Sequence, residues 1–271
     1  MRLVQLATRS LRRARQRPLE VLAAALVLAT SVYVVVGLLW VARYPLMTDL
    51  PFHTAIASVF RHYLDDAWHF REQFELQPLA VPYLTTYLLA AALMTFTSAV
   101  LAMKVAAGLM LLLLPAGLAV LCLGMRKSPL LGVAGLGLSW CGLTSWGFVN
   151  FVGALGLFAM SVGVALRMVD RPRPGLGAWL VGLLLLLFVT HPFRFPFAVA
   201  AVLGAAVLTY PATRRARPVL RSLLGPVVLF AAWWWLRPAA VAGDLGALAL
   251  HSERLAEIPR DREILCMCHH G

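Results

Sequence analysis

Long apolar runs separated by short polar segments make up most of the chain. The runs cover residues 19–42, 79–99, 100–124, 130–168, 176–210 and 223–236. A helix needs about 20 apolar residues to cross the hydrocarbon core of a bilayer, and the two longest runs have room to turn back, near 145–150 and near 191–196. The pattern therefore predicts seven or eight spans. Because hydrocarbon offers backbone groups no hydrogen-bond partners, we expect an all-α, polytopic transmembrane helix bundle.

Residues 43–78 form a polar loop after the first run. Within it, apolar side chains recur at helical spacing, at Phe52, Ile56, Val59, Phe60 and Tyr63. This periodicity predicts an amphipathic helix lying on the membrane surface. The chain thus divides into a basic N-terminus (1–18), a membrane bundle with this loop (19–236) and a short polar tail (237–271).

Composition supports a membrane protein: 61% of the residues are hydrophobic, 13% are charged and the mean hydropathy is +0.80. The net charge of +12 comes largely from arginines gathered near the N-terminus and around 214–221. Such clusters are topology signals and headgroup contacts. A nucleic-acid-binding surface would need a folded basic domain outside the membrane, so we expect no nucleic-acid partner.

Charge also predicts the orientation. The loop 43–78 carries three arginines against five acidic residues and should face away from the cytoplasm, whereas the basic turns near Arg126, Arg171 and Arg214 should be cytoplasmic. The run 19–42 is too long for a cleaved signal peptide and is expected to be a signal anchor. Hydropathy, however, places three spans between the basic N-terminus and Arg126, which conflicts with a cytoplasmic location for both.

Acidic residues are scarce, and Asp49 with His53 opens the outer loop just past the first span. An Asp before Leu50 and Pro51 is suited to capping a helix. A carboxylate at that position is also suited to removing a proton from an acceptor hydroxyl, and His53, one turn later, to orienting it or meeting a phosphate. The two roles are compatible, and we take Asp49 and His53 as the catalytic candidates.

The same loop holds a second polar group. Asp65 and Asp66 form either a solvated helix face or a pair that gathers a divalent cation to neutralise a phosphate leaving group. With Arg61 they are candidate substrate-binding residues, and no metal ligand is assigned. Near the C-terminus, Cys266, Cys268, His269 and His270 form either a soft-metal site or an incidental terminus.

His191 and Arg194 lie between prolines inside an otherwise apolar stretch. Charged groups at membrane depth usually line a cavity or bind a headgroup, so these two residues are candidate substrate-binding residues. The alternative is a turn at the membrane surface in which Arg194 reaches phosphate.

A basic start, one span, an outer loop opening with Asp49, a surface helix, and then Pro78 and Pro82 leading into a multi-span bundle resemble the GT-C membrane glycosyltransferases. The likeness covers roughly the first half of the chain. It implies transfer of a sugar from a polyprenyl-phosphate donor at the outer face, with Asp49 matching the family's acidic residue and Asp65 and Asp66 its paired-acid variants. Family members generally have more spans, so the chain is expected to be a fragment or a degenerate relative.

Two other function classes remain open. A non-catalytic scaffold or lipid-binding protein needs only the surface helix and the arginine loops, while a transporter would place polar residues at mid-membrane. In each case membrane lipid is a partner, and we expect a multi-pass protein of a bacterial inner membrane. The sugar, the acceptor and the oligomeric state are left open by the sequence.

Overall fold

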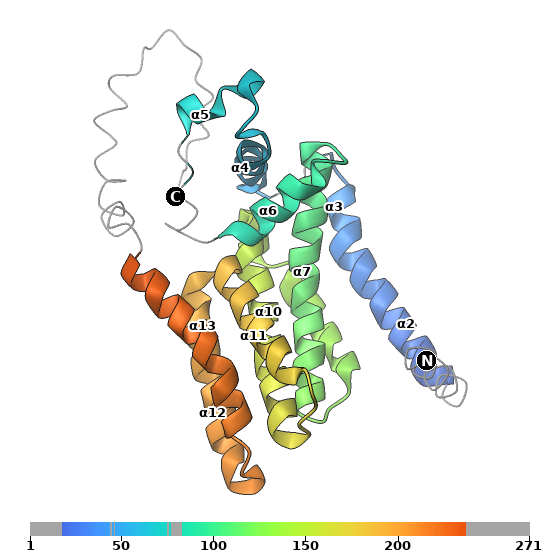
Figure 1. Ribbon diagram of the computed structural model, residues 1–271. Coiled ribbons are helices and arrows are strands. Elements are labelled where there is room, and N and C mark those ends of the chain that lie inside the picture. Colours follow the sequence, from blue (N-terminus) through green and yellow to red (C-terminus); the bar gives the residue numbers. More distant parts are fainter. Residues whose placement is uncertain (1–17, 44, 46, 75, 77–82, 237–271) are drawn as a thin grey trace, which may run out of the picture.

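A computed structural model describes residues 18–43, 45, 47–74, 76 and 83–236 (Figure 1). All regular elements among these residues are helical. They are α2 Pro18–Val32, the π-helical η1 Tyr33–Gly37, α3 Leu38–Trp40, α4 Leu50–His62, η2 Asp66–Trp68, α5 Phe70–Gln73, α6 Leu84–Leu93, α7 Ala99–Gly124, η3 Pro129–Ala134, α8 Gly135–Ser139, α9 Gly142–Trp146, α10 Val149–Asp170, α11 Leu176–Thr190, η4 Pro192–Arg194, α12 Phe195–Thr213 and α13 Arg217–Leu236. The predicted all-α bundle is confirmed.

Five of the described helices are long and apolar enough to cross a membrane. They are Pro18–Trp40, Ala99–Gly124, Val149–Asp170, Pro192–Thr213 and Arg217–Leu236. The chain is therefore a helical membrane protein. The expected number of seven or eight spans is not confirmed, because three further apolar helices are shorter, namely Leu84–Leu93, Pro129–Ser139 and Leu176–Thr190.

The short helix α6 removes the conflict between hydropathy and charge. Its ten residues extend about 15 Å, half of what a span requires. In Figure 1 it lies at the end of the bundle where α4 is found, beside the start of α7. Among the described residues between the start of α2 and Arg126, two segments therefore run the length of the bundle, namely α2–α3 and α7. We call the end with α4 and α6 the Asp49 end, and the opposite end, with Arg126, Arg171 and Arg214, the basic end.

Helices α7 and α10 form the centre of the bundle and approach each other through glycines. A Cβ atom built on Gly117 would lie 2.2 Å from the carbonyl oxygen of Gly156, and one built on Gly124 would lie 2.5 Å from that of Gly163. The two contacts are seven residues apart on each helix, so they fall on one face. Small residues let membrane helices pack backbone to backbone where apolar burial supplies little driving force.

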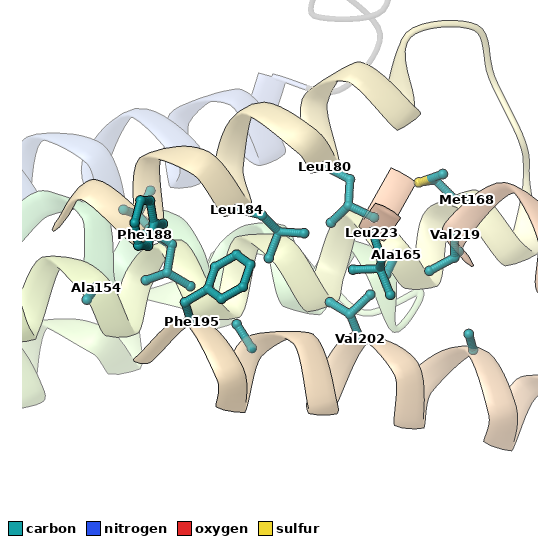
Figure 2. Packing of buried hydrophobic residues seen from close by; sticks show 14 of the residues in the cluster. Ala154, Ala165, Met168, Leu180, Leu184, Phe188, Phe195, Val202, Val219 and Leu223 are labelled. Carbon is teal, nitrogen blue, oxygen red and sulfur yellow. The ribbon is translucent and has the colours of Figure 1, made fainter. Parts of the chain in front are cut away.

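A second layer packs on the other side of α10. Leucines of α11 and apolar residues of α12 and α13 meet Ala154, Ala165 and Met168 of α10 in one buried cluster (Figure 2). Phe188 of α11 and Phe195 of α12 meet edge to face, with ring centroids 6.0 Å apart. Aromatic pairs of this geometry add to the packing energy and fix where α11 turns into α12.

At the basic end, Asp170 at the end of α10 ties three loops together. The Arg126 guanidinium donates to both carboxylate oxygens, with Nε 3.0 Å from Oδ2. Arg171 Nε lies 3.7 Å from Oδ2, and Arg215 donates to the Asp170 carbonyl at 3.2 Å. The positive turns are thus held next to one another by a single acidic residue.

The expected surface helix forms as α4, but it packs more deeply than an interfacial helix would. It contacts α6 and α7, and it buries Leu50, Ala57 and Val59. Of the five apolar positions that carried the prediction, Phe52 is 59% exposed. The other four are buried or half-buried, so the buried side of α4 includes most of the predicted positions. It also includes the half-buried His53 and Thr54.

The glycine contact between α7 and α10 can be tested with Gly156→Ala. The added Cβ would lie 2.1 Å from the carbonyl oxygen of Leu113, so the helices must separate, at a cost of about 1–3 kcal/mol as for overpacking in general. Thermal unfolding in detergent should show a lower melting temperature. Gly182→Ala on α11 is the matched control, since nothing lies within 4 Å of its Cβ. Equal melting temperatures for the two variants would contradict the close contact.

Candidate functional site

The last residues of α9 and the turn that follows them hold Asp49 in place. The backbone N–H of Thr48 donates to the carbonyl oxygen of Ser145 at 2.9 Å, and that of Asp49 donates to the carbonyl oxygen of Trp146 at 3.0 Å. Gly147 follows with φ +99°, and a Cβ there would lie 3.0 Å from the Asp49 Cβ. Glycine at this position both adopts the left-handed backbone and leaves room for the Asp49 side chain.

Asp49 occupies the N-cap position of α4, with Pro51 in the first turn, as the sequence suggests. Its side chain makes no capping hydrogen bond, however. The carboxylate, on a half-buried residue, therefore remains available for other contacts at the start of the helix. Asp49 thus has the position of a helix cap, as predicted from the sequence, but its side chain does not make the capping hydrogen bond.

His53 lies next to Asp49 and is held by two further groups. Its Nδ1 lies 2.8 Å from the Tyr87 hydroxyl of α6, and a backbone hydrogen bond links it to Gly147. Burial lowers the pKa of His53 below 6.5, although the Asp49 carboxylate and the Gly147 hydrogen bond act in the opposite direction. The imidazole is therefore neutral at pH 7 and able to accept a proton.

A second polar group surrounds η4, where α11 turns into α12. The His191 ring meets Tyr83 and Phe151 edge to face, with centroids 4.9 Å and 5.5 Å away. The Arg194 guanidinium carbon lies 4.0 Å from the centre of the Phe151 ring. Among the residues that the structure describes, no carboxylate pairs with Arg194. This cation is stabilised by an aromatic face and has capacity for an anion.

His191 itself is unusual for a buried polar residue. Its Nδ1 is buried and has no hydrogen-bond partner within the described part of the chain. Burial, assisted by the charge of Arg194, lowers the pKa of His191 from 6.5 to about 4. A buried, unpaired nitrogen costs free energy, and such atoms are often found where a ligand completes the bonding.

Helix α6 connects the two groups. Tyr87, which bonds to His53, and Tyr83, which contacts His191, are one turn apart on it. Thr85 bonds to Thr190 at 2.8 Å, and Thr86 donates to Asn150. No hydrogen bond or ion pair in the described segments joins Asp49 or His53 directly to His191 or Arg194. The two groups are therefore linked only by their contacts with the α6 segment.

Sequence reasoning missed several of these positions. Tyr83, Tyr87 and Phe151 lie in apolar runs, where aromatic residues are usual, so nothing in the sequence distinguishes them. Gly147 carried a signal, since a glycine between two apolar segments indicates a turn. Asn150 of α10 accepts a hydrogen bond from Thr86 of α6 and so joins two helices.

The other candidates in the loop lie apart from this site. Asp65 accepts from the Ala67 N–H at 3.1 Å and lies 3.5 Å from His62, while Asp66 pairs with Arg71. Arg61 is exposed on α4. Asp65 and Asp66 are thus engaged locally in an exposed segment. Within the described ranges no group of three or more His, Cys, Asp or Glu residues could hold a metal ion. Cys266, Cys268, His269 and His270 lie outside the described residues.

Comparison of the chain with protein-family models, curated proteins and solved structures finds no match. The function has to be argued from the site alone.

The orphaned nitrogen of His191 leads to a prediction about pH. Because the folded-state pKa of His191 is about 4 and the unfolded value is 6.5, the unfolded chain takes up a proton that the folded chain does not. Stability should therefore fall as the pH drops from 6.5 toward 4. In thermal unfolding across this range, His191→Gln should show a shallower decline than the wild type. Parallel curves for the two proteins would mean that His191 titrates normally.

Proposed function

We propose that the protein is a membrane glycosyltransferase that uses a polyprenyl-phosphate-linked sugar as donor. The observation that carries the proposal is the pair of groups along α6. Beside Tyr87 of α6, the Asp49 carboxylate lies near the neutral imidazole of His53. One turn earlier, Tyr83 contacts His191, which neighbours Arg194, a cation with no acidic partner in the described chain. A base and an anion-binding cation held by contacts with the same short helix are what transfer from a lipid phosphate requires.

The proposed reaction uses Asp49 as the general base. Its carboxylate takes the proton of the acceptor hydroxyl as the acceptor oxygen attacks the anomeric carbon of the sugar. The bond from that carbon to the phosphate oxygen breaks, and the polyprenyl phosphate leaves with the electron pair. Attack opposite to the leaving group inverts the anomeric configuration. His53, fixed by Tyr87 and Gly147, positions the Asp49 side chain.

Arg194 and His191 are proposed to hold the donor phosphate. Charge develops on the phosphate oxygens as the bond breaks, and a fixed guanidinium stabilises that charge most effectively where water is excluded. In the tautomer that carries its proton on Nδ1, His191 donates a further hydrogen bond to a phosphate oxygen. Tyr83 and Phe151 hold both side chains by ring contacts.

The membrane topology is part of the proposal. We assign the basic end to the cytoplasm and the Asp49 end to the outer face of a bacterial inner membrane, in accordance with the positive-inside rule. The five long helices, together with α11 and the broken segment η3–α8–α9, would give seven passages, the lower of the two expected numbers.

The role of Asp49 can be tested in proteoliposomes supplied with a panel of polyprenyl-phosphate sugars. Asp49→Asn keeps the size of the side chain but removes the base, and should lower the transfer rate by about 100-fold or more. Asp66→Asn is the matched control, because Asp66 is exposed and paired only with Arg71. Transfer that is unaltered in Asp49→Asn would dispose of the mechanism.

Arg194 should affect the donor rather than the acceptor. Arg194→Gln removes the charge that meets the phosphate, so the KM for the donor should rise and kcat should fall, while the KM for the acceptor should change little. Steady-state kinetics with each substrate varied in turn separates these effects. Arg173→Gln, an exposed arginine at the basic end, serves as the control. An equal rise in both KM values would indicate a general loss of structure.

A further inference from the structure

A pocket of about 140 Å³ lies between the start of α4 and the first turns of α7. Its walls are Pro45, Leu50, Pro51, Thr54, Val100, Met103 and Lys104. Five of these seven side chains are apolar. The Thr54 hydroxyl donates to the carbonyl of Leu50 at 2.8 Å, so it is turned toward its own helix. Lys104 is the single charged residue of the lining.

Lys104 is only 7% exposed, although it carries an ammonium group. Its Nζ donates to the carbonyl oxygen of Ala42 at 2.6 Å and lies 5.7 Å from the centre of the Trp40 ring. An ammonium group has three N–H donors. No carboxylate in the described segments forms an ion pair with it. Burying a cation without a counter-charge is costly, so the site is incomplete as it stands.

The depth at which the pocket lies along the helices indicates that its ligand is a lipid. Lys104 is five residues beyond the start of α7, about 7 Å along the helix, and it bonds to Ala42, two residues after the end of the first span. Trp40 beside it is a residue type typical of the membrane interface. A phosphate at this depth would come from a headgroup, and the apolar walls formed by Leu50, Val100 and Met103 suit the acyl chain below it.

We propose that this pocket binds the phosphate of an anionic membrane lipid, with Lys104 as the counter-charge. The pocket lies on the α7 side of α4 and shares no residue with the Asp49 and His191 groups. Binding would fasten the end of the first span to α4 and α7, because the same ammonium group holds Ala42. The proposal does not depend on glycosyl transfer.

The test is thermal unfolding of the purified full chain in detergent during titration with phosphatidylglycerol, phosphatidylcholine or inorganic phosphate. Phosphatidylglycerol should raise the melting temperature of the wild type. For Lys104→Met the apparent affinity should fall about tenfold or more, which corresponds to the loss of one charge-assisted hydrogen bond. Lys127→Met, at an exposed lysine of the basic end, should bind like the wild type.

Val100→Phe keeps Lys104 but fills the pocket from its apolar wall, so it should weaken the lipid as Lys104→Met does. It also decides the matter should Lys104→Met prove unstable. Three results would overturn the proposal: equal effects of phosphatidylcholine, equal effects of inorganic phosphate, or an equal loss in Lys127→Met. The first would show that charge is irrelevant, the second that the anion is not a lipid, and the third that binding is general electrostatics.

Discussion

The backbone contact between α7 and α10 is the constraint on which the rest of the structure depends. With Gly117 against Gly156 and Gly124 against Gly163, the two helices are too close for side chains to intervene. That closeness fixes the position of everything attached to α10. The turn that holds Asp49 precedes it, Asn150 and Phe151 are in its first turn, and Asp170 closes its far end. A shift of α10 would therefore move the Asp49 group and the Phe151 ring together.

Short helices, and not the long spans, position the polar groups against α7 and α10. Helix α6 has only ten residues, yet its two threonines and Tyr87, together with Tyr83 just before it, contact α4, α10, α11 and the residue that precedes η4. Hydrogen bonds between helices in a low-dielectric interior must be complete, because each buried polar group left unpaired costs free energy. The same reasoning makes the unpaired Nδ1 of His191 and the ammonium of Lys104 informative, since a membrane protein retains such groups chiefly where they meet something polar.

Much of this architecture could be predicted from hydropathy alone. The all-helical class, the long helices and the helix beginning after Asp49 follow from run length and period. The sequence could not show that residues 84–93 stop short of a span, because length in an apolar run does not reveal where a chain turns; here it turns after Met94. Of the site, Asp49, His53, His191 and Arg194 stood out as polar residues in oily surroundings. Their aromatic partners did not, because tyrosine and phenylalanine are ordinary in such runs, and only tertiary packing brings them to the imidazoles.

The shortness of α11 has a consequence for the surrounding lipid. Its 15 residues extend about 22 Å, some 8 Å less than a typical hydrocarbon core. A helix that is shorter than the hydrocarbon core thins the bilayer around it, which draws the headgroup layer inward. In the proposed topology this thinning would dimple the leaflet above His191 and Arg194, so that the isoprenoid tail of the proposed donor could remain in the acyl region while its phosphate enters sideways, without leaving the membrane plane.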